Sequence, residues 1–239
     1  MSKHKRFIET PITLEIEKAL TAVSSIEEGM DSYPLGEYMF QSLFLRMTGF
    51  QEQKLKCINW ELANEDLGYR RALLKNEDRL AEYSRLDDKQ SVYKRLSKYL
   101  VRETGYGIGS LINKAAIAKG SKKDIVDIFK NTRFQFWDEH HYENLKKDKK
   151  LFQVSHFATD TLLSEPLTSL YEQLYNDRNR WAHNTLSYQE DMPTLRILSE
   201  ATEGCHNYFA YFALLNLIDK IFVGFFKQFE SLLESRSYD

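Results

Sequence analysis

The chain has 239 residues, of which 42% are hydrophobic and 13% aromatic, and it contains only four prolines, ten glycines and two cysteines. This composition is that of an ordinary globular protein, and it excludes a disordered chain, a low-complexity repeat and a disulfide-stapled scaffold. The formal net charge of −2 gives no overall basic or acidic bias, and the two cysteines, Cys57 and Cys205, favour a reducing compartment.

The N-terminal part of the chain predicts two helices. The first residues, M-S-K-H-K-R, run into F-I-E-T-P without an apolar stretch, so we expect no signal peptide and a cytoplasmic protein. Residues Thr13 to Glu28 predict a short helix. From Leu35 to about Glu65 apolar residues recur at spacings of three and four, the pattern of one buried stripe on a long helix. The stripe contains Phe40, Leu43, Phe44, Met47, Phe50, Leu55, Ile58 and Leu62.

The middle of the chain is basic. Between Tyr69 and Lys150 there are 20 lysines and arginines against 12 aspartates and glutamates, whereas the remainder has 13 against 23. This excess indicates an anionic partner or the acidic part of a second subunit, although solvated helix faces give the same composition. The expected elements are a charge-rich helix over Lys75–Leu100, a break at Gly105–Gly109, short helices over Leu111–Ala118 and Lys122–Lys130, and a basic helix end or loop at Lys146–Lys150.

The C-terminal part predicts two more helices. One extends from Leu162 to about Asn184, with Ser164 or Thr161 near its start. The other begins after Pro193 and is apolar on more than one face as far as Leu232. Its length also fits a membrane span, but three polar residues fall in its middle, and ionisable groups there cost several kcal/mol each. A central bundle helix, with no membrane, is therefore favoured; the three residues are Asn216, Asp219 and Lys220.

No alternation of apolar and polar residues lasts long enough to predict a sheet. The expected fold is therefore all-α, an up-and-down helical bundle built from residues of about 10–68 and 160–235. The basic residues of about 69–150 form a helical insertion packed beside this bundle.

Several short motifs have structural explanations. The loop G-Y-G-I-G-S, Gly105 to Ser110, follows no strand and lacks the lysine of a phosphate-binding loop, so it predicts a turn before a helix. In D-E-H-H-Y-E, Asp138 and His141 share a helix face, but nothing else in the chain has the spacing of further metal ligands. His156 and His206 are expected to be packed or surface histidines. We therefore expect no metal and no cofactor.

An arginine followed by a histidine after four to six intervening residues occurs twice. By chance about one occurrence is expected, so the context has to decide. Arg133 and His140 enclose aromatic residues, which indicates the edge of a packing face. Arg178 and His183 enclose N-R-W-A, in which Asn179 lies four residues before His183 and therefore on the same helix face.

The stretch R-N-R-W-A-H, near the end of a helix and followed by a loop and a long apolar helix, resembles the HEPN superfamily (higher eukaryotes and prokaryotes nucleotide-binding). The family signature is an arginine, a polar residue beside it, and a histidine four to six residues beyond. The segment from Met39 to Trp60 is similar to the first long helix of such domains, which often contributes a polar residue to the site. Glu52 is the candidate for that residue.

The resemblance implies a homodimer in which two copies of the motif meet in a cleft, and a metal-independent endoribonuclease of toxin–antitoxin or phage-defence systems. Arg178, Asn179 and His183 are then the candidate catalytic residues. The candidate substrate-binding residues are Arg180, Glu52, Lys146, Lys147, Lys149 and Lys150. The expected partners are RNA and an antitoxin or other defence protein. Two alternatives stay open: a module that binds RNA or a nucleotide without cleaving it, and a structural or partner-binding protein in which the motif is only a polar helix end.

Overall fold

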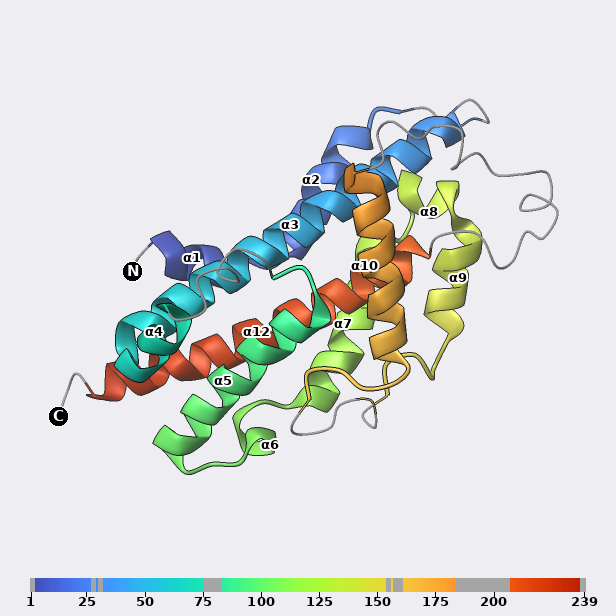
Figure 1. The fold of residues 1–239 in the computed structure, drawn as a ribbon. Helices are drawn as coiled ribbons and strands as arrows, with labels where there is room; N and C mark the ends of the chain where they lie inside the picture. Colours follow the sequence, from blue (N-terminus) through green and yellow to red (C-terminus); the bar gives the residue numbers. More distant parts are fainter. Residues whose placement is uncertain are drawn as a thin grey trace.

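The computed structural model describes residues 3–26, 29, 32–74, 83–153, 156, 161–183 and 207–236. This part of the chain contains eleven helices and no strand, so the protein is an all-α helical bundle, as the sequence predicts (Figure 1). The helices are α1 (Lys3–Glu9), α2 (Thr13–Val23), α3 (Tyr33–Glu65), α4 (Leu67–Leu74), α5 (Leu86–Thr104), α6 (Ile108–Leu111), α7 (Lys114–Phe129), α8 (Arg133–Trp137), α9 (Glu139–Lys147), α10 (Leu167–His183) and α12 (Tyr208–Arg236).

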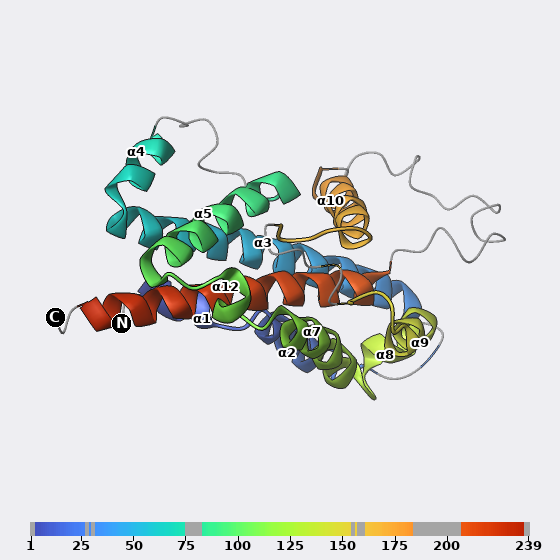
Figure 2. The ribbon, with the colours of Figure 1, turned by 90° about the horizontal axis from the view of Figure 1, so that it is seen from below.

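Helix α12 is the centre of the molecule. In Figure 2 it lies between α3, α5 and α10 on one side and α1, α2 and α7 on the other. Its residues from Tyr208 to Phe222 are almost all buried, and burial of that much apolar side chain is the largest favourable contribution to folding. The apolar stripe predicted on α3 lies against it, because Phe40 stacks on Tyr208 with ring centroids 4.9 Å apart.

The three polar residues in the middle of α12, Asn216, Asp219 and Lys220, all have protein partners. The ammonium group of Lys54 lies 2.6 Å from the carboxylate of Asp219, and both side chains are almost fully buried. The side-chain amide of Asn216 donates to the carbonyl of Ser121 at 3.1 Å, and Lys220 pairs with Asp124. By length and composition α12 is the one described helix that could cross a membrane, and 83% of its most apolar window is buried inside the protein.

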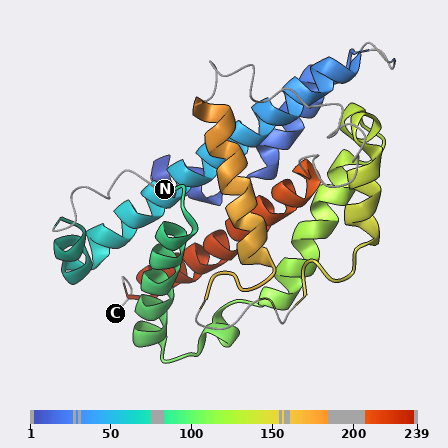
Figure 3. The same ribbon diagram turned by 45° about the vertical axis from the view of Figure 1, so that its right-hand side comes forward.

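Helix α10 crosses α3 and α12, and it also packs against α5 (Figure 3). Its buried residues Leu167, Tyr171 and Leu174 follow the helical period and form the face that meets the bundle. This helix was expected from about Leu162. It begins only at Leu167, because Pro166 disfavours a helical backbone at the residue before it.

The middle segment contributes to the core of the bundle. Helices α5 and α7 both pack directly on α12, and Val92, Leu96, Ile125 and Phe129 belong to the same buried cluster as the residues of α12. The prediction of two short helices over Leu111–Ala118 and Lys122–Lys130 was wrong. A single helix, α7, spans most of that range. Gly120 does not end it, because a glycine within a helix costs only about 1 kcal/mol and the buried face continues from Ala118 to Phe129.

The ends of the other predicted helices lie closer to those in the structure. The long helix α3 begins at Tyr33 and ends at Glu65, which confirms the prediction of Leu35 to about Glu65. Helix α2 ends at Val23. Two of the predicted helices were expected to start earlier, at Lys75 and after Pro193. Residues 75–82 and 194–206 lie outside the described part of the chain, and the described helices α5 and α12 begin after them.

The short helix α8 lies close against the start of α3 at a glycine. A Cβ atom added at Gly36 would meet the indole ring of Trp137 at 2.7 Å, so only glycine allows this approach. The indole nitrogen of Trp137 also donates to the hydroxyl of Ser32 at 2.9 Å. These contacts fix one end of the long helix that carries Glu52.

Candidate functional site

Arg178 lies between two of the residues that the sequence singled out. Its guanidinium donates to the carboxylate of Glu52 on α3 at 3.0 Å and to the side-chain oxygen of Asn179 at 3.1 Å. The arginine side chain is 24% exposed and the glutamate 16% exposed, so the pair is largely shielded but open to solvent on one side. The structure thus brings Arg178, Asn179 and Glu52 together, although 126 residues separate the two charged groups.

The position of Arg178 follows from the packing of α10. Arg178 is four residues after the buried Leu174, at the edge of the helix face that meets the bundle. The preceding residue, Asp177, is buried and accepts a hydrogen bond from the hydroxyl of Tyr211 on α12 at 2.8 Å. Trp181 packs edge-on against Phe44 with ring centroids 5.3 Å apart, so it forms the packed side of this turn. Arg178 therefore lies between two residues, Asp177 and Trp181, that fix α10 against the bundle.

A buried lysine, Lys89 near the start of α5, lies beside this ion pair. Its side chain is 2% exposed, and its ammonium group donates to the carbonyl of Tyr83 at 2.7 Å. The pKa of Lys89 is lowered from 10.5 to about 7, chiefly by burial; Glu52 and Asp88 oppose this shift, and Arg178 adds to it. The sequence reasoning missed this residue. Lys89 does, however, precede the buried Val92, Tyr93 and Leu96 by three, four and seven residues, and that spacing places it on the apolar face of α5.

Two tyrosines of α10 complete the surroundings. The hydroxyl of Tyr171 donates to the carbonyl of Ser84 at 2.6 Å, and burial raises its pKa. The hydroxyl of Tyr175 accepts a hydrogen bond from Arg85 at 3.3 Å. Hydrogen bonds from Asn179 and then from Arg85 lower the pKa of Tyr175, because they stabilise the phenolate. Neither tyrosine nor Arg85 was singled out from the sequence.

We call the group formed by these side chains the α10 polar cluster. It joins residues of α3, α5 and α10, and it consists of Glu52, Arg85, Lys89, Tyr175, Arg178 and Asn179. A guanidinium has five N–H donors, and the hydrogen bonds of Arg178 to Glu52 and Asn179 use two of them. The arrangement can therefore accept an anion at Arg178 without first breaking the bond to Glu52.

The other two candidate residues of the motif, His183 and Arg180, do not belong to the α10 polar cluster as the structure describes it. Helix α10 ends at His183, four residues after Asn179, but the side chain of His183 lies outside the described part of the structure. Arg180 is exposed on the outer side of α10. The helix thus places His183 in the turn after Arg178 and Asn179, at the end of the same element.

The four candidate lysines lie on a different part of the surface. Lys146 and Lys147 are at the end of α9 and pair with Glu143 at 2.8 and 3.4 Å, and Lys149 and Lys150 are exposed in the turn that follows. Helix α9 packs mainly against α7, α8 and α12, whereas α10 packs against α3, α5 and α12. The structure does not bring these lysines into the α10 polar cluster.

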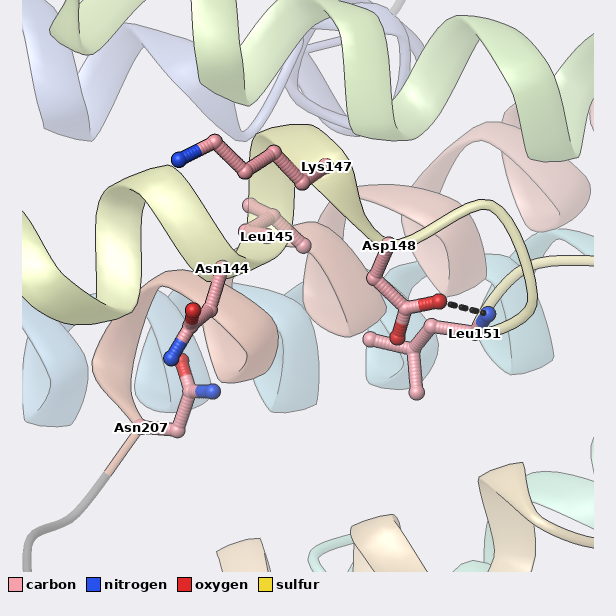
Figure 4. A pocket seen from close by; sticks show the side chains of 6 residues that line it. All are labelled: Asn144, Leu145, Lys147, Asp148, Leu151 and Asn207. Atoms are coloured by element: carbon pink, nitrogen blue, oxygen red, sulfur yellow. Dashed lines mark hydrogen bonds between the residues drawn. The ribbon is translucent and has the colours of Figure 1, made fainter. Parts of the chain in front are cut away.

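A hollow of about 390 Å³ lies beside those lysines, between the end of α9 and the start of α12 (Figure 4). The side chains of Asn144 and Asn207 point toward one another across it. Its lining residues are Asn144, Leu145, Lys147, Asp148, Leu151 and Asn207, none of which belongs to the α10 polar cluster.

The other histidine motif is explained by helix capping. The carboxylate of Asp138 accepts from the backbone N–H of His141 at the start of α9, and it also lies 2.8 Å from Nδ1 of that histidine. His140 is exposed and hydrogen-bonds to Asn144 at 2.9 Å. Within the described ranges no group of three or more His, Cys, Asp and Glu side chains is placed to hold a metal ion.

No protein-family model, no curated protein and no solved structure matches this chain. The resemblance to HEPN domains therefore depends on the motif and its position in the fold, and the function that it implies is a proposal.

Proposed function

We propose that this protein is a metal-independent endoribonuclease that cleaves RNA by attack of a ribose 2′-hydroxyl on the neighbouring phosphate. The observation that carries the proposal is the arrangement at the end of α10, where Arg178 is partly exposed between Glu52 and Asn179, with His183 four residues beyond Asn179. A helix that ends in a packed arginine and a histidine offers the two groups that this reaction requires.

Each residue has a role that its chemistry suits. The reaction places negative charge on the phosphate oxygens, and the guanidinium of Arg178 can donate to them in a fixed geometry. His183 acts as the general acid or base, because an imidazole exchanges protons near neutral pH. Asn179 and Glu52 hold Arg178 from two sides, so they orient it before RNA binds.

The wider setting is part of the same proposal. We infer a cytoplasmic homodimer that places two copies of the motif in one cleft and acts as a toxin or phage-defence effector with an antitoxin or defence partner. The burial of most of α12 among the other helices supports a role for that helix in the protein core. The basic middle segment supports an anionic partner such as RNA.

A cleavage assay on purified protein tests the proposal. The wild type should cleave single-stranded RNA in excess EDTA and leave 2′,3′-cyclic phosphate ends. The variant His183→Ala should lose about 10² to 10⁴ in rate, the usual contribution of a general acid or base. The matched control is His140→Ala, which removes an exposed histidine from the chain's other arginine–histidine pair and should cleave like the wild type.

The outcomes separate the competing functions. A wild type that binds RNA without shortening it would be a binding module, and one with no affinity for RNA would be a structural or partner-binding protein. Full activity in His183→Ala would overturn the mechanism. Activity that needs added Mg²⁺ would also overturn it, and would direct attention to Asp138, Glu139 and His141.

A further inference from the structure

Arg85 occupies a position that helix stability does not explain. It is the N-cap residue of α5, where Ser, Thr, Asp or Asn is preferred, and its side chain makes no capping hydrogen bond. A positive charge at the N-terminus of a helix also opposes the helix dipole, and Asp87 and Asp88 in the first turn offset that effect. The exposed guanidinium instead donates to the hydroxyl of Tyr175 on α10 at 3.3 Å.

Polar contacts connect Arg85 to the candidate catalytic residues. Asn179 lies close enough to Tyr175 to lower the pKa of its hydroxyl, Asn179 accepts from Arg178 at 3.1 Å, and Arg178 donates to Glu52 at 3.0 Å. Two guanidinium groups therefore belong to one chain of polar side chains, which runs from Arg85 at the start of α5, through three residues of α10, to Glu52 on α3.

The spacing along α10 suits a single strand. Tyr175, Asn179 and His183 follow one another at intervals of four residues, which is about 6 Å along a helix, and they share one face of it. That step is comparable with the distance between neighbouring phosphates in an extended strand. Arg85 meets this row at Tyr175, the end away from His183.

We propose that Arg85 and Tyr175 bind a phosphate of single-stranded RNA upstream or downstream of the phosphate held at Arg178. This inference rests on the proposed function, since it extends the same site along α10. Glu52 and Asp88 keep the local net charge low, so recognition depends on directed donors, namely the guanidinium of Arg85 and the phenol of Tyr175. The middle segment thereby contributes to RNA binding through α5.

The test is a binding measurement with wild-type protein and a short 2′-O-methyl oligoribonucleotide, which lacks the hydroxyl needed for cleavage. Arg85→Gln should raise the dissociation constant roughly ten- to a hundredfold, as expected for loss of a charged hydrogen bond. It should also make the slope of log affinity against log salt shallower by about 0.7, the value for one phosphate contact in a single strand. Lys98→Gln is the matched control, because Lys98 is exposed on the same helix about 20 Å away and should bind like the wild type.

Two further variants refine the test. Tyr175→Phe removes one hydroxyl and no charge, so it should weaken binding without changing the salt slope. Arg85→Lys retains the charge but not the planar fork, and it should restore the slope with only part of the affinity. Circular dichroism of each variant reports whether the helices are intact.

Cleavage of unmodified RNA by the same proteins distinguishes this inference from the proposed function. Wild-type cleavage together with unchanged binding by Arg85→Gln and Tyr175→Phe would overturn the inference and leave the ribonuclease. Binding that depends on Arg85 without any cleavage would support the subsite and overturn the enzyme. An equal loss of affinity in Lys98→Gln, or a wild type that does not bind the oligonucleotide, would overturn the inference.

Discussion

The buried Lys89 makes the stability of the protein depend on pH in a predictable direction. Its pKa is about 7 in the folded protein and 10.5 ordinarily. Between those values the unfolded chain binds more protons at this position than the folded chain, so the free energy of unfolding rises as pH increases. The destabilising contribution of Lys89 is complete below pH 7 and disappears above about 10.5.

The magnitude follows from the shift. Each pH unit in that window changes the free energy by at most about 1.4 kcal/mol, so between pH 7 and 10 the wild type should gain about 3 to 4 kcal/mol from this one group. Lys89→Met keeps a side chain of similar length without the charge and removes that gain. It also leaves the carbonyl of Tyr83 without its donor, which costs about 1 to 3 kcal/mol at every pH.

Urea unfolding of the wild type and Lys89→Met at intervals from pH 7 to 10 measures the effect. The quantity of interest is the difference in unfolding free energy between the two proteins, because the titration of other groups is nearly the same in both. The unfolding free energy of Lys89→Met minus that of the wild type should be several kcal/mol more positive at pH 7 than at pH 10. Lys98→Met, an exposed control on the same helix, should show no such change. Parallel curves for the wild type and Lys89→Met would refute the reasoning.

Two further predictions concern packing and the buried ion pair. Gly36→Ala forces a Cβ atom to within 2.7 Å of the indole ring of Trp137 and should destabilise the protein by about 1 to 3 kcal/mol. Gly49→Ala, on the same helix with open space around it, should stabilise the protein by up to about 1 kcal/mol. Thermal unfolding measures both changes, and two changes in stability of the same sign would contradict the packing described here. Asp219→Asn leaves the charge of Lys54 buried without a counter-charge and should cost about 3 to 5 kcal/mol, while Lys220→Gln, in a more exposed pair, should cost less than about 1; similar losses in urea unfolding would show that burial does not set the difference.

The long helices could be predicted because each has a buried apolar stripe of helical period. The stripe of α3, from Phe40 to Leu62, fixes both its type and its approximate ends. The start of α10 was predicted five residues too early, because Leu162 and Leu163 are buried without being helical and continue the apolar pattern before Pro166. Apolar spacing reports burial, and burial does not by itself require a helix.

The candidate site was only partly predictable. Glu52 was selected by resemblance, and the structure places it against Arg178. Arg85 and Tyr175 carry no sequence signal, since an exposed arginine and a half-buried tyrosine are common on any helix. They come together only because α5 packs beside α10, and that contact joins residues 90 apart in the sequence.

Charged residues within apolar stripes are a signal that sequence reasoning can use. Lys54 and Lys89 both stand in the buried register of their helices, and both are almost fully buried. The stripe predicts that each must be paired or lose its charge, because an unpaired buried ion is very unfavourable. Which of the two occurs depends on the tertiary structure. Lys54 meets the carboxylate of Asp219 at 2.6 Å, whereas Lys89 donates to a backbone carbonyl and lies among groups of both signs. The lysine without a dedicated counter-ion is the one beside Arg178, so of these two buried charges the less compensated one lies at the candidate site.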